Sequence, residues 1–95
     1  MNKIKLVKWS AQWCGPCKAL NPVWLDVKNQ YVDNPNVELV SYDVDDENDP
    51  SPKDYGVKSV PTIIFLSNDK EVHRTTGMVS KDIIKSKITE LLNQT

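Results

Sequence analysis

Two cysteines, Cys14 and Cys17, are the residues of this sequence whose type and spacing suggest a chemistry. Thiols separated by two residues can form a reversible disulfide or bind a metal, but a bridge across so short a loop hardly restrains the unfolded chain. A structural zinc site needs about four ligands. Besides the two thiols the chain has one histidine, His73, and it lies in a distant element. We therefore predict redox chemistry and no metal site.

The cysteine pair is expected where a strand ends and a helix begins. Over residues 16–32 apolar side chains recur every three or four positions, which is typical of one helical face. A helix N-terminus stabilises an anion, so Cys14 is expected to be an exposed and nucleophilic thiolate. Cys17 lies one turn further into the helix. From there it can attack the mixed disulfide on Cys14 and release the partner.

Three neighbours support this assignment. Pro16 suits the first turn of a helix, because its fixed backbone angle is helical and its missing N–H would have no partner there. Gly15 leaves room for the backbone of a partner protein. Trp13 borders Cys14 and is the tryptophan expected at the substrate surface.

The remaining pattern supplies the elements that position this junction. The continuous apolar run at residues 62–66 predicts a strand buried on both faces, and Ser80 is a favourable N-cap for a last helix. One helix-linked crossover followed by a hairpin predicts an α/β fold with a mixed sheet and helices on both sides. The full prediction is a strand at residues 3–9, a helix at 16–32, a strand at 37–44, a loop or short helix at 45–55, a hairpin of strands at 62–66 and 71–76, and a helix after Ser80.

Composition narrows the class of protein. The 95 residues predict a single domain, residues 1–95, and 12 basic against 13 acidic side chains give a net charge of -1, which argues against nucleic-acid binding. No apolar run approaches the roughly 18 residues that a membrane helix needs, and lysines interrupt the first residues where a signal peptide would be apolar. We therefore expect a cytoplasmic protein without a membrane partner, in reducing surroundings that favour functional over structural cysteines.

Residues 13–18 read Trp-Cys-Gly-Pro-Cys-Lys, which resembles the active-site signature of the thioredoxin family. The resemblance covers essentially the whole chain, and its further matches are Ala11 before the motif, Pro22 within the helix, the Val60-Pro61-Thr62 element and Gly77 after the last strand. It implies a thioredoxin fold and a dithiol–disulfide oxidoreductase that reduces disulfides in protein substrates.

The resemblance also implies roles outside the cysteine pair. From the residues alone, Pro61 is equally consistent with a cis peptide bond and with a proline that opens a strand. In the family this bond is cis and lies against the sulfurs, which would expose the backbone of Val60 for strand-like pairing with an extended substrate. Gly77 is expected at the same surface. The resemblance further implies a monomer without a bound cofactor that receives electrons from thioredoxin reductase, a flavin- and NADPH-dependent enzyme.

The sequence departs from the family in two places. Thioredoxins usually carry an extra strand and helix at the front, and only 13 residues precede Cys14, so we expect a four-stranded sheet without them. Lys8 stands where most members have a buried aspartate, and Ser41 where they often have the lysine that partners it. Lys8 shares a strand face with Leu6, so its stem should be covered while its amine reaches water. Lys8 is then either a modulator of thiol acidity or a solvated residue without effect.

Two other functions stay open on the sequence. A glutaredoxin-like protein recharged by glutathione fits the short front end, whereas the Gly-Pro pair between the cysteines and Trp13 before them favour a thioredoxin. A binding subunit could instead clamp a larger enzyme through Trp13, Val60 and Pro61, with the redox chemistry incidental. Two well-placed cysteines argue against that interpretation.

Overall fold

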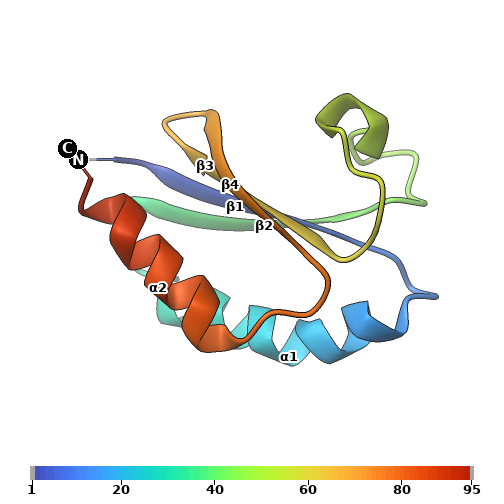
Figure 1. Cartoon of the computed structure of the whole chain (residues 1–95), viewed down its shortest axis with the longest axis horizontal. Coiled ribbons are helices and arrows are strands. Elements are labelled where there is room, and N and C mark those ends of the chain that lie inside the picture. The colour runs from blue at the N-terminus through green and yellow to red at the C-terminus, as the bar shows by residue number, and fades with distance from the viewer. Residues whose placement is uncertain (1, 95) are drawn as a thin grey trace.

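The chain forms a sheet, two α-helices and a short 3-10 helix in the computed structural model, which describes residues 2–94 (Figure 1). The order of elements is the predicted one, and the ends of the strands and of the first helix differ from prediction by one or two residues. The elements are β1 (Ile4–Ser10), α1 (Gly15–Gln30), β2 (Val37–Asp43), η1 (Pro52–Tyr55), β3 (Thr62–Ser67), β4 (Lys70–Thr76) and α2 (Lys81–Leu92).

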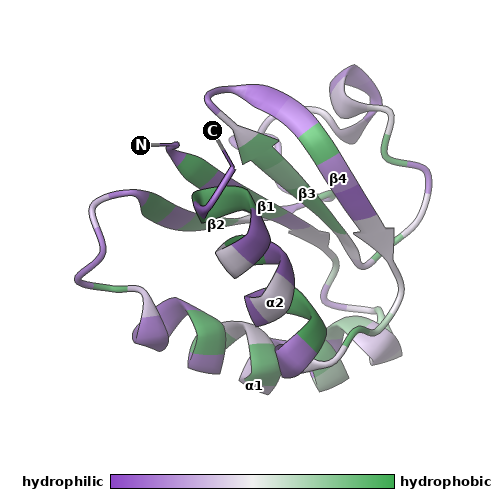
Figure 2. Ribbon diagram, turned by 60° about the vertical axis from the view of Figure 1, so that its left-hand side comes forward, coloured by the Kyte–Doolittle hydropathy of each residue, from purple (hydrophilic) through white to green (hydrophobic). Residues whose placement is uncertain are grey.

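The described strands form one mixed sheet in the order β2-β1-β3-β4, which confirms the predicted four-stranded sheet. β1 pairs parallel with β2 and antiparallel with β3, and β3 and β4 form the predicted antiparallel hairpin. Parallel neighbours need a long crossover connection, and α1 supplies it. β3 is hydrophobic along most of its length in Figure 2, as expected of a central strand that is covered on both faces.

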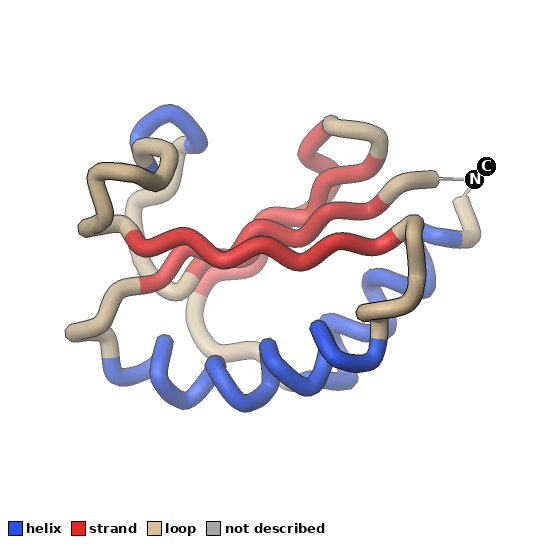
Figure 3. Tube along the Cα trace, turned by 180° about the vertical axis from the view of Figure 1, so that it is seen from behind, coloured by secondary structure: helices blue, strands red, loops and turns tan. Residues whose placement is uncertain are grey.

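Both α-helices cover the same face of the sheet (Figures 1 and 3), so the prediction of helices on both sides is wrong. The connection between β2 and β3 is the one that could have placed a helix on the opposite face. Pro50 and Pro52 interrupt it, because proline cannot donate the helical hydrogen bond, and only the four residues of η1 become helical. The opposite face carries a smaller apolar cluster centred on Val7, Trp9 and Ile64.

The main core lies between the sheet and the two helices. Side chains of β1 alternate, so Ile4 and Leu6 enter this core while Val7 and Trp9 enter the smaller cluster. The helices bury the side chains that the three-to-four spacing predicts, namely Leu20, Trp24, Val27, Ile84, Ile88 and Leu91. This packing fixes the start of α1 against the end of β1, where the cysteines lie.

Local capping sets the ends of the helices. α1 stops at Gln30, two residues before the predicted end, and the N–H of Tyr31 closes its last turn on the carbonyls of Val27 and Lys28. The prediction of Ser80 as an N-cap is confirmed, since its hydroxyl accepts the N–H of Ile83. Within residues 2–94, no helix is long and apolar enough to cross a membrane.

Candidate active site

Cys14 and Cys17 form a disulfide at the start of α1, at the end of the molecule where β1 leads into that helix (Figure 1). Cys14 is the N-cap residue with an extended backbone, and its Sγ accepts the N–H of Cys17 at 3.2 Å. The Cα atoms of the pair are 5.2 Å apart. The first turn of α1 therefore directs an amide N–H, and the positive end of the helix dipole, at the sulfur of Cys14.

The two cysteines are buried in this oxidised form. Cys14 is 5% exposed and Cys17 is 2% exposed, so the expectation of an exposed Cys14 is wrong for the disulfide state. Both pack with Ala11 and with the partly buried Val44 and Val60. The apolar neighbours arise because the end of β1 and the loop before β3 close over the start of α1.

The cover over the disulfide is thin, because the residues on both sides of Cys14 are exposed. Trp13 is 69% exposed, and Gly15 and Pro16 also reach the surface. A Cβ added to Gly15 would meet no atom within 4 Å, so open space lies directly over this part of the helix. The indole Nε1 of Trp13 donates to the Asp45 carboxylate at 2.7 Å, which holds the ring beside the bridge.

The loop before β3 brings a second segment against the sulfurs. The Val60–Pro61 peptide bond is cis, and the Val60 carbonyl oxygen lies 3.7 Å from Cys14 Sγ. That pair is a contact in the disulfide, where the sulfur carries no proton, and becomes a possible S–H···O hydrogen bond only in the reduced protein. Gly77 lies behind this loop with φ of 82°, and its N–H donates to the Pro61 carbonyl at 2.8 Å.

An apolar groove of about 220 Å³ runs beside the disulfide. Trp13 forms one wall, and the segment that joins η1 to the cis peptide bond forms the other. Its lining residues are Trp13, Val44, Pro52, Val57, Lys58, Ser59 and Val60.

Lys8 is buried beneath the site, on the face of β1 that α1 covers. It is 4% exposed, so the expectation that its amine reaches water is wrong. Its Nζ donates to Asn21 Oδ1 at 2.7 Å and lies 5.4 Å from the centre of the Trp24 ring. No ion pair found within residues 2–94 includes Lys8. Burial of the amine without a carboxylate lowers the pKa of Lys8 from its ordinary value of 10.5.

Asn21 connects Lys8 with the surroundings of Cys17. Cys17 and Asn21 are four positions apart on α1, so their side chains lie one above the other on one helical face. They also line the same surface hollow of about 420 Å³, together with Ser10, Gln12 and Asp43 among others. Cys17 therefore borders this hollow, although only 2% of its surface is exposed.

The described part of the chain holds no group of three or more histidine, cysteine or acidic side chains placed to bind a metal ion. The cysteine pair is bonded to itself instead.

A family model described as Thioredoxin matches residues 1–90. The chain belongs to the thioredoxin family. Curated thioredoxins share about a third of its residues: that of Chlamydia trachomatis is 37% identical over 79 residues (83% of this chain and 74% of the relative). That of Mycoplasmoides gallisepticum is 36% identical over 84 residues (88% and 80%).

Solved thioredoxin structures share the architecture. The Fasciola hepatica thioredoxin matches with a TM-score of 0.74 and 32% identity, over 93% of this chain and 80% of that one. A thioredoxin-2, described as a component of malaria parasite protein secretion machinery, matches with a TM-score of 0.82 and 25% identity, over 94% and 84%. The fold is therefore the thioredoxin fold. As a member of this family of disulfide reductases, the chain is a dithiol–disulfide oxidoreductase whose redox-active group is the Cys14–Cys17 disulfide.

The structure of this thioredoxin-family protein adds two residues that sequence reasoning did not identify. Asn21, the partner of Lys8, lies one helical turn after Cys17, and that spacing was a usable signal. Asp45, the partner of Trp13, belongs to an acidic loop after β2, and nothing in the local sequence distinguishes it from its acidic neighbours.

Proposed function

We propose that the protein reduces disulfides in protein substrates, with Cys14 as the nucleophile and Cys17 as the resolving thiol. The position of the disulfide across the first turn of α1, with Cys14 as the N-cap beside an exposed Trp13, carries this proposal. We further propose that residues 1–95 act as a single monomeric domain in the cytoplasm, where reducing conditions return the pair to the dithiol state.

The proposed reaction balances in two exchange steps. The Cys14 thiolate attacks one sulfur of the substrate disulfide, and the other substrate sulfur leaves with the bonding electron pair and takes up a proton. Cys17 then loses its proton and attacks Cys14 Sγ in the mixed disulfide, and the second substrate sulfur leaves as a thiolate. The substrate gains two electrons, and the protein is left with the Cys14–Cys17 disulfide.

The start of α1 gives the two thiols different tasks. In the reduced protein the Cys17 N–H and the helix dipole face Cys14 Sγ and favour its thiolate, which offsets the apolar contacts around the sulfur. Cys17 lies deeper and faces the hollow it shares with Asn21, where water can receive its proton. The order of attack follows: the outer thiol meets the substrate, and the inner thiol meets only the outer one.

We assign Lys8 as a modulator of this pair that does not itself touch the substrate. Its buried ammonium is bonded to Asn21, one turn from Cys17, and a positive charge there favours a thiolate over a thiol. Lys8→Met should therefore slow the release of substrate from the mixed disulfide and move the pH midpoint of that step upward. Lys5→Met, on the opposite face of β1, is the matched control. Equal pH midpoints in the parent and Lys8→Met would remove this role.

We place the substrate in the apolar groove between Trp13 and residues 57–60. Substrate backbone in an extended conformation would pair with the backbone of Val60 beside the cis peptide bond, a mode of binding that reads little sequence. The N–H of Gly77 already donates to the Pro61 carbonyl, so Gly77 would support the shape of this surface rather than donate to the substrate.

We propose thioredoxin reductase, a flavin enzyme that uses NADPH, as the source of electrons. The family of the chain and its Trp-Cys-Gly-Pro-Cys segment support this donor over glutathione. The test is reduction of insulin disulfides, first with dithiothreitol and then with NADPH and a thioredoxin reductase. Turnover with glutathione alone, without turnover with the reductase, would overturn the assignment.

Two variants test the roles of the cysteines. Cys17→Ser should accumulate a mixed disulfide between Cys14 and the substrate, visible by mass spectrometry, because no resolving thiol remains. Cys14→Ser should form no such adduct, since Cys17 lies within the first turn of α1, behind the N-cap position, and is 2% exposed. The opposite pattern of adducts would reverse the two roles.

A further inference from the structure

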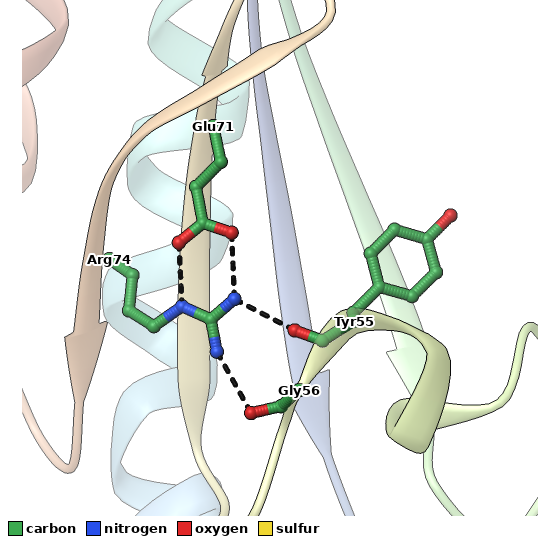
Figure 4. Close-up of polar contacts among 4 residues, drawn as sticks. All are labelled: Tyr55, Gly56, Glu71 and Arg74. Atoms are coloured by element: carbon green, nitrogen blue, oxygen red, sulfur yellow. Dashed lines mark hydrogen bonds and ion pairs between the residues drawn. The ribbon is translucent and has the colours of Figure 1, made fainter.

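Arg74 joins the edge of the sheet to the segment that forms the groove (Figure 4). Its guanidinium donates two hydrogen bonds to the Glu71 carboxylate, from Nε at 2.8 Å and from Nη2 at 2.7 Å. Nη2 also donates to the Tyr55 carbonyl at 2.8 Å, and Nη1 donates to the Gly56 carbonyl at 3.1 Å. Four of the five guanidinium N–H donors therefore form hydrogen bonds, two with the Glu71 carboxylate and two with main-chain carbonyls.

The Glu71 carboxylate fixes the plane of the guanidinium. A bidentate pair of this kind holds Arg74 in one orientation, and its hydrogen bonds lower the pKa of Glu71 from the ordinary value of a glutamate. The donors that remain then point across to the end of η1. Lysine has no planar fork and could not hold both Glu71 and two carbonyls in this geometry.

The segment that Arg74 holds lies at the surface and is only partly packed: the Tyr55 ring lies 5.3 Å from the Trp9 ring, and Val57 and Val60 pack against the smaller apolar cluster. None of the four residues of η1 is buried, and the helix ends at Gly56 in the left-handed conformation with φ of 66°. The N–H of Val57 returns to the Pro52 carbonyl at 2.9 Å, and the chain then runs through residues 57–60 to the cis peptide bond. These residues are one wall of the apolar groove, so the position of that wall depends on where η1 ends.

We propose that Arg74 is a positioning residue that holds the groove wall at residues 57–60 opposite Trp13 and thereby sets the affinity for protein disulfides. The inference rests on the proposed function. It concerns binding in the groove and leaves the chemistry of the sulfurs unchanged, because the Arg74 guanidinium contacts η1 and β4 and neither cysteine.

The test compares two substrates. Arg74→Gln should raise the KM for insulin disulfides by about three- to tenfold while kcat stays within about twofold, the pattern of lost binding rather than lost catalysis. Reduction of a small disulfide, bis(2-hydroxyethyl) disulfide, should stay within about twofold of the parent rate, because it makes no use of an extended groove. Lys70→Gln removes a charge from the exposed start of β4 without touching η1, and should leave both rates unchanged.

Two further variants separate positioning from loss of fold. Glu71→Gln keeps the donors of Arg74 but weakens their fixation, and should give a smaller rise in KM of the same kind. Arg74→Lys should recover part of the affinity through one carbonyl bond. An unchanged insulin KM in Arg74→Gln, or an equal loss with both substrates, would overturn the inference. Failure of the parent with both substrates would instead overturn the proposed function.

Discussion

Replacement of Lys8 by methionine should make the protein more stable. Methionine keeps the unbranched stem that packs under α1 and removes the buried charge. Lys8 is 4% exposed. Within residues 2–94 its ammonium donates one hydrogen bond, to Asn21 Oδ1 at 2.7 Å, and lies 5.4 Å from the centre of the Trp24 ring. Asn21 itself is exposed, so its amide can bond to water once the amine is gone.

The size of the effect follows from three opposing terms. Removal of an ammonium from water costs several kcal/mol even after the protein relaxes. A hydrogen bond from a charged donor returns about 1.5–3 kcal/mol, and the contact with the Trp24 ring returns about 0.5–2 kcal/mol. Replacement of a buried ion pair by apolar side chains often stabilises a protein by about 1–4 kcal/mol, and within residues 2–94 Lys8 has no carboxylate that would offset its charge. We expect Lys8→Met to raise the free energy of unfolding at pH 7 by about 1–3 kcal/mol.

The gain in stability should depend on pH in a defined direction. Burial lowers the pKa of Lys8 in the folded protein below its ordinary value of 10.5. Between the folded and the unfolded pKa the unfolded chain binds more protons, so the stability of the parent rises with pH across that window. The advantage of Lys8→Met is therefore complete below the folded pKa. It shrinks as the pH approaches 10.5, at a rate of up to about 1.4 kcal/mol per pH unit.

Urea unfolding of the oxidised proteins at pH 7 and pH 10 measures both effects, since the disulfide removes thiol titration from the comparison. Lys5→Met is the control: Lys5 lies on the opposite face of β1 and is only half-buried, so its change should stay within about 0.5 kcal/mol at both values of pH. A less stable Lys8→Met, or a gain that is equal at pH 7 and pH 10, would refute the reasoning from burial.

Three further predictions concern the surface of the site. Gly15→Ala should leave the thermal midpoint unchanged or raised, because its Cβ meets no atom, but should slow reduction of insulin more than that of a small disulfide. Gly77→Val should lower the free energy of unfolding by about 1–3 kcal/mol, measured in urea, because a β-branched residue is strained at a φ of 82°. Asp45→Ala should shift the NMR signal of the Trp13 indole N–H while stability stays within about 0.5 kcal/mol, since the bond between them is exposed. An unchanged indole signal would contradict the hydrogen bond between Trp13 and Asp45. A fully stable Gly77→Val would contradict the strain expected at this φ, and a destabilised Gly15→Ala would contradict the open space over Gly15.

The junction of β1 and α1 could be predicted because its signals are local. The spacing of Cys14 and Cys17, the position of Pro16 and the apolar repeat of the helix each act within a few residues of the chain. The order of elements along the chain and the hairpin followed in the same way from alternation and from the turn between β3 and β4. These features do not depend on which distant segments meet.

The predictions that the structure contradicts concern contacts between segments that are distant in the chain. The burial of Cys14 depends on Val60, which is 46 residues away in the chain and meets the sulfur only through the tertiary fold. The side of the sheet that each helix covers is likewise a property of whole connections. Pro50 and Pro52, which interrupt the connection between β2 and β3, were visible in the sequence. That both α-helices would therefore lie on one face of the sheet could be predicted only with knowledge of the strand order.

For Lys8, the prediction from a local signal was correct, and the prediction that depended on a distant segment was wrong. Alternation along β1 correctly placed it on the face of Leu6, but the expectation that its amine reaches water failed because α1 covers the whole side chain and offers Asn21 instead. A sequence usually violates local rules where function demands it, and such sites are stabilised by the rest of the fold. A buried lysine whose hydrogen-bond partner, Asn21, lies one helical turn from Cys17 fits that description. If Lys8→Met proves more stable and also slower in resolving the mixed disulfide, then the buried charge lowers the stability of the fold and speeds the step that Cys17 carries out.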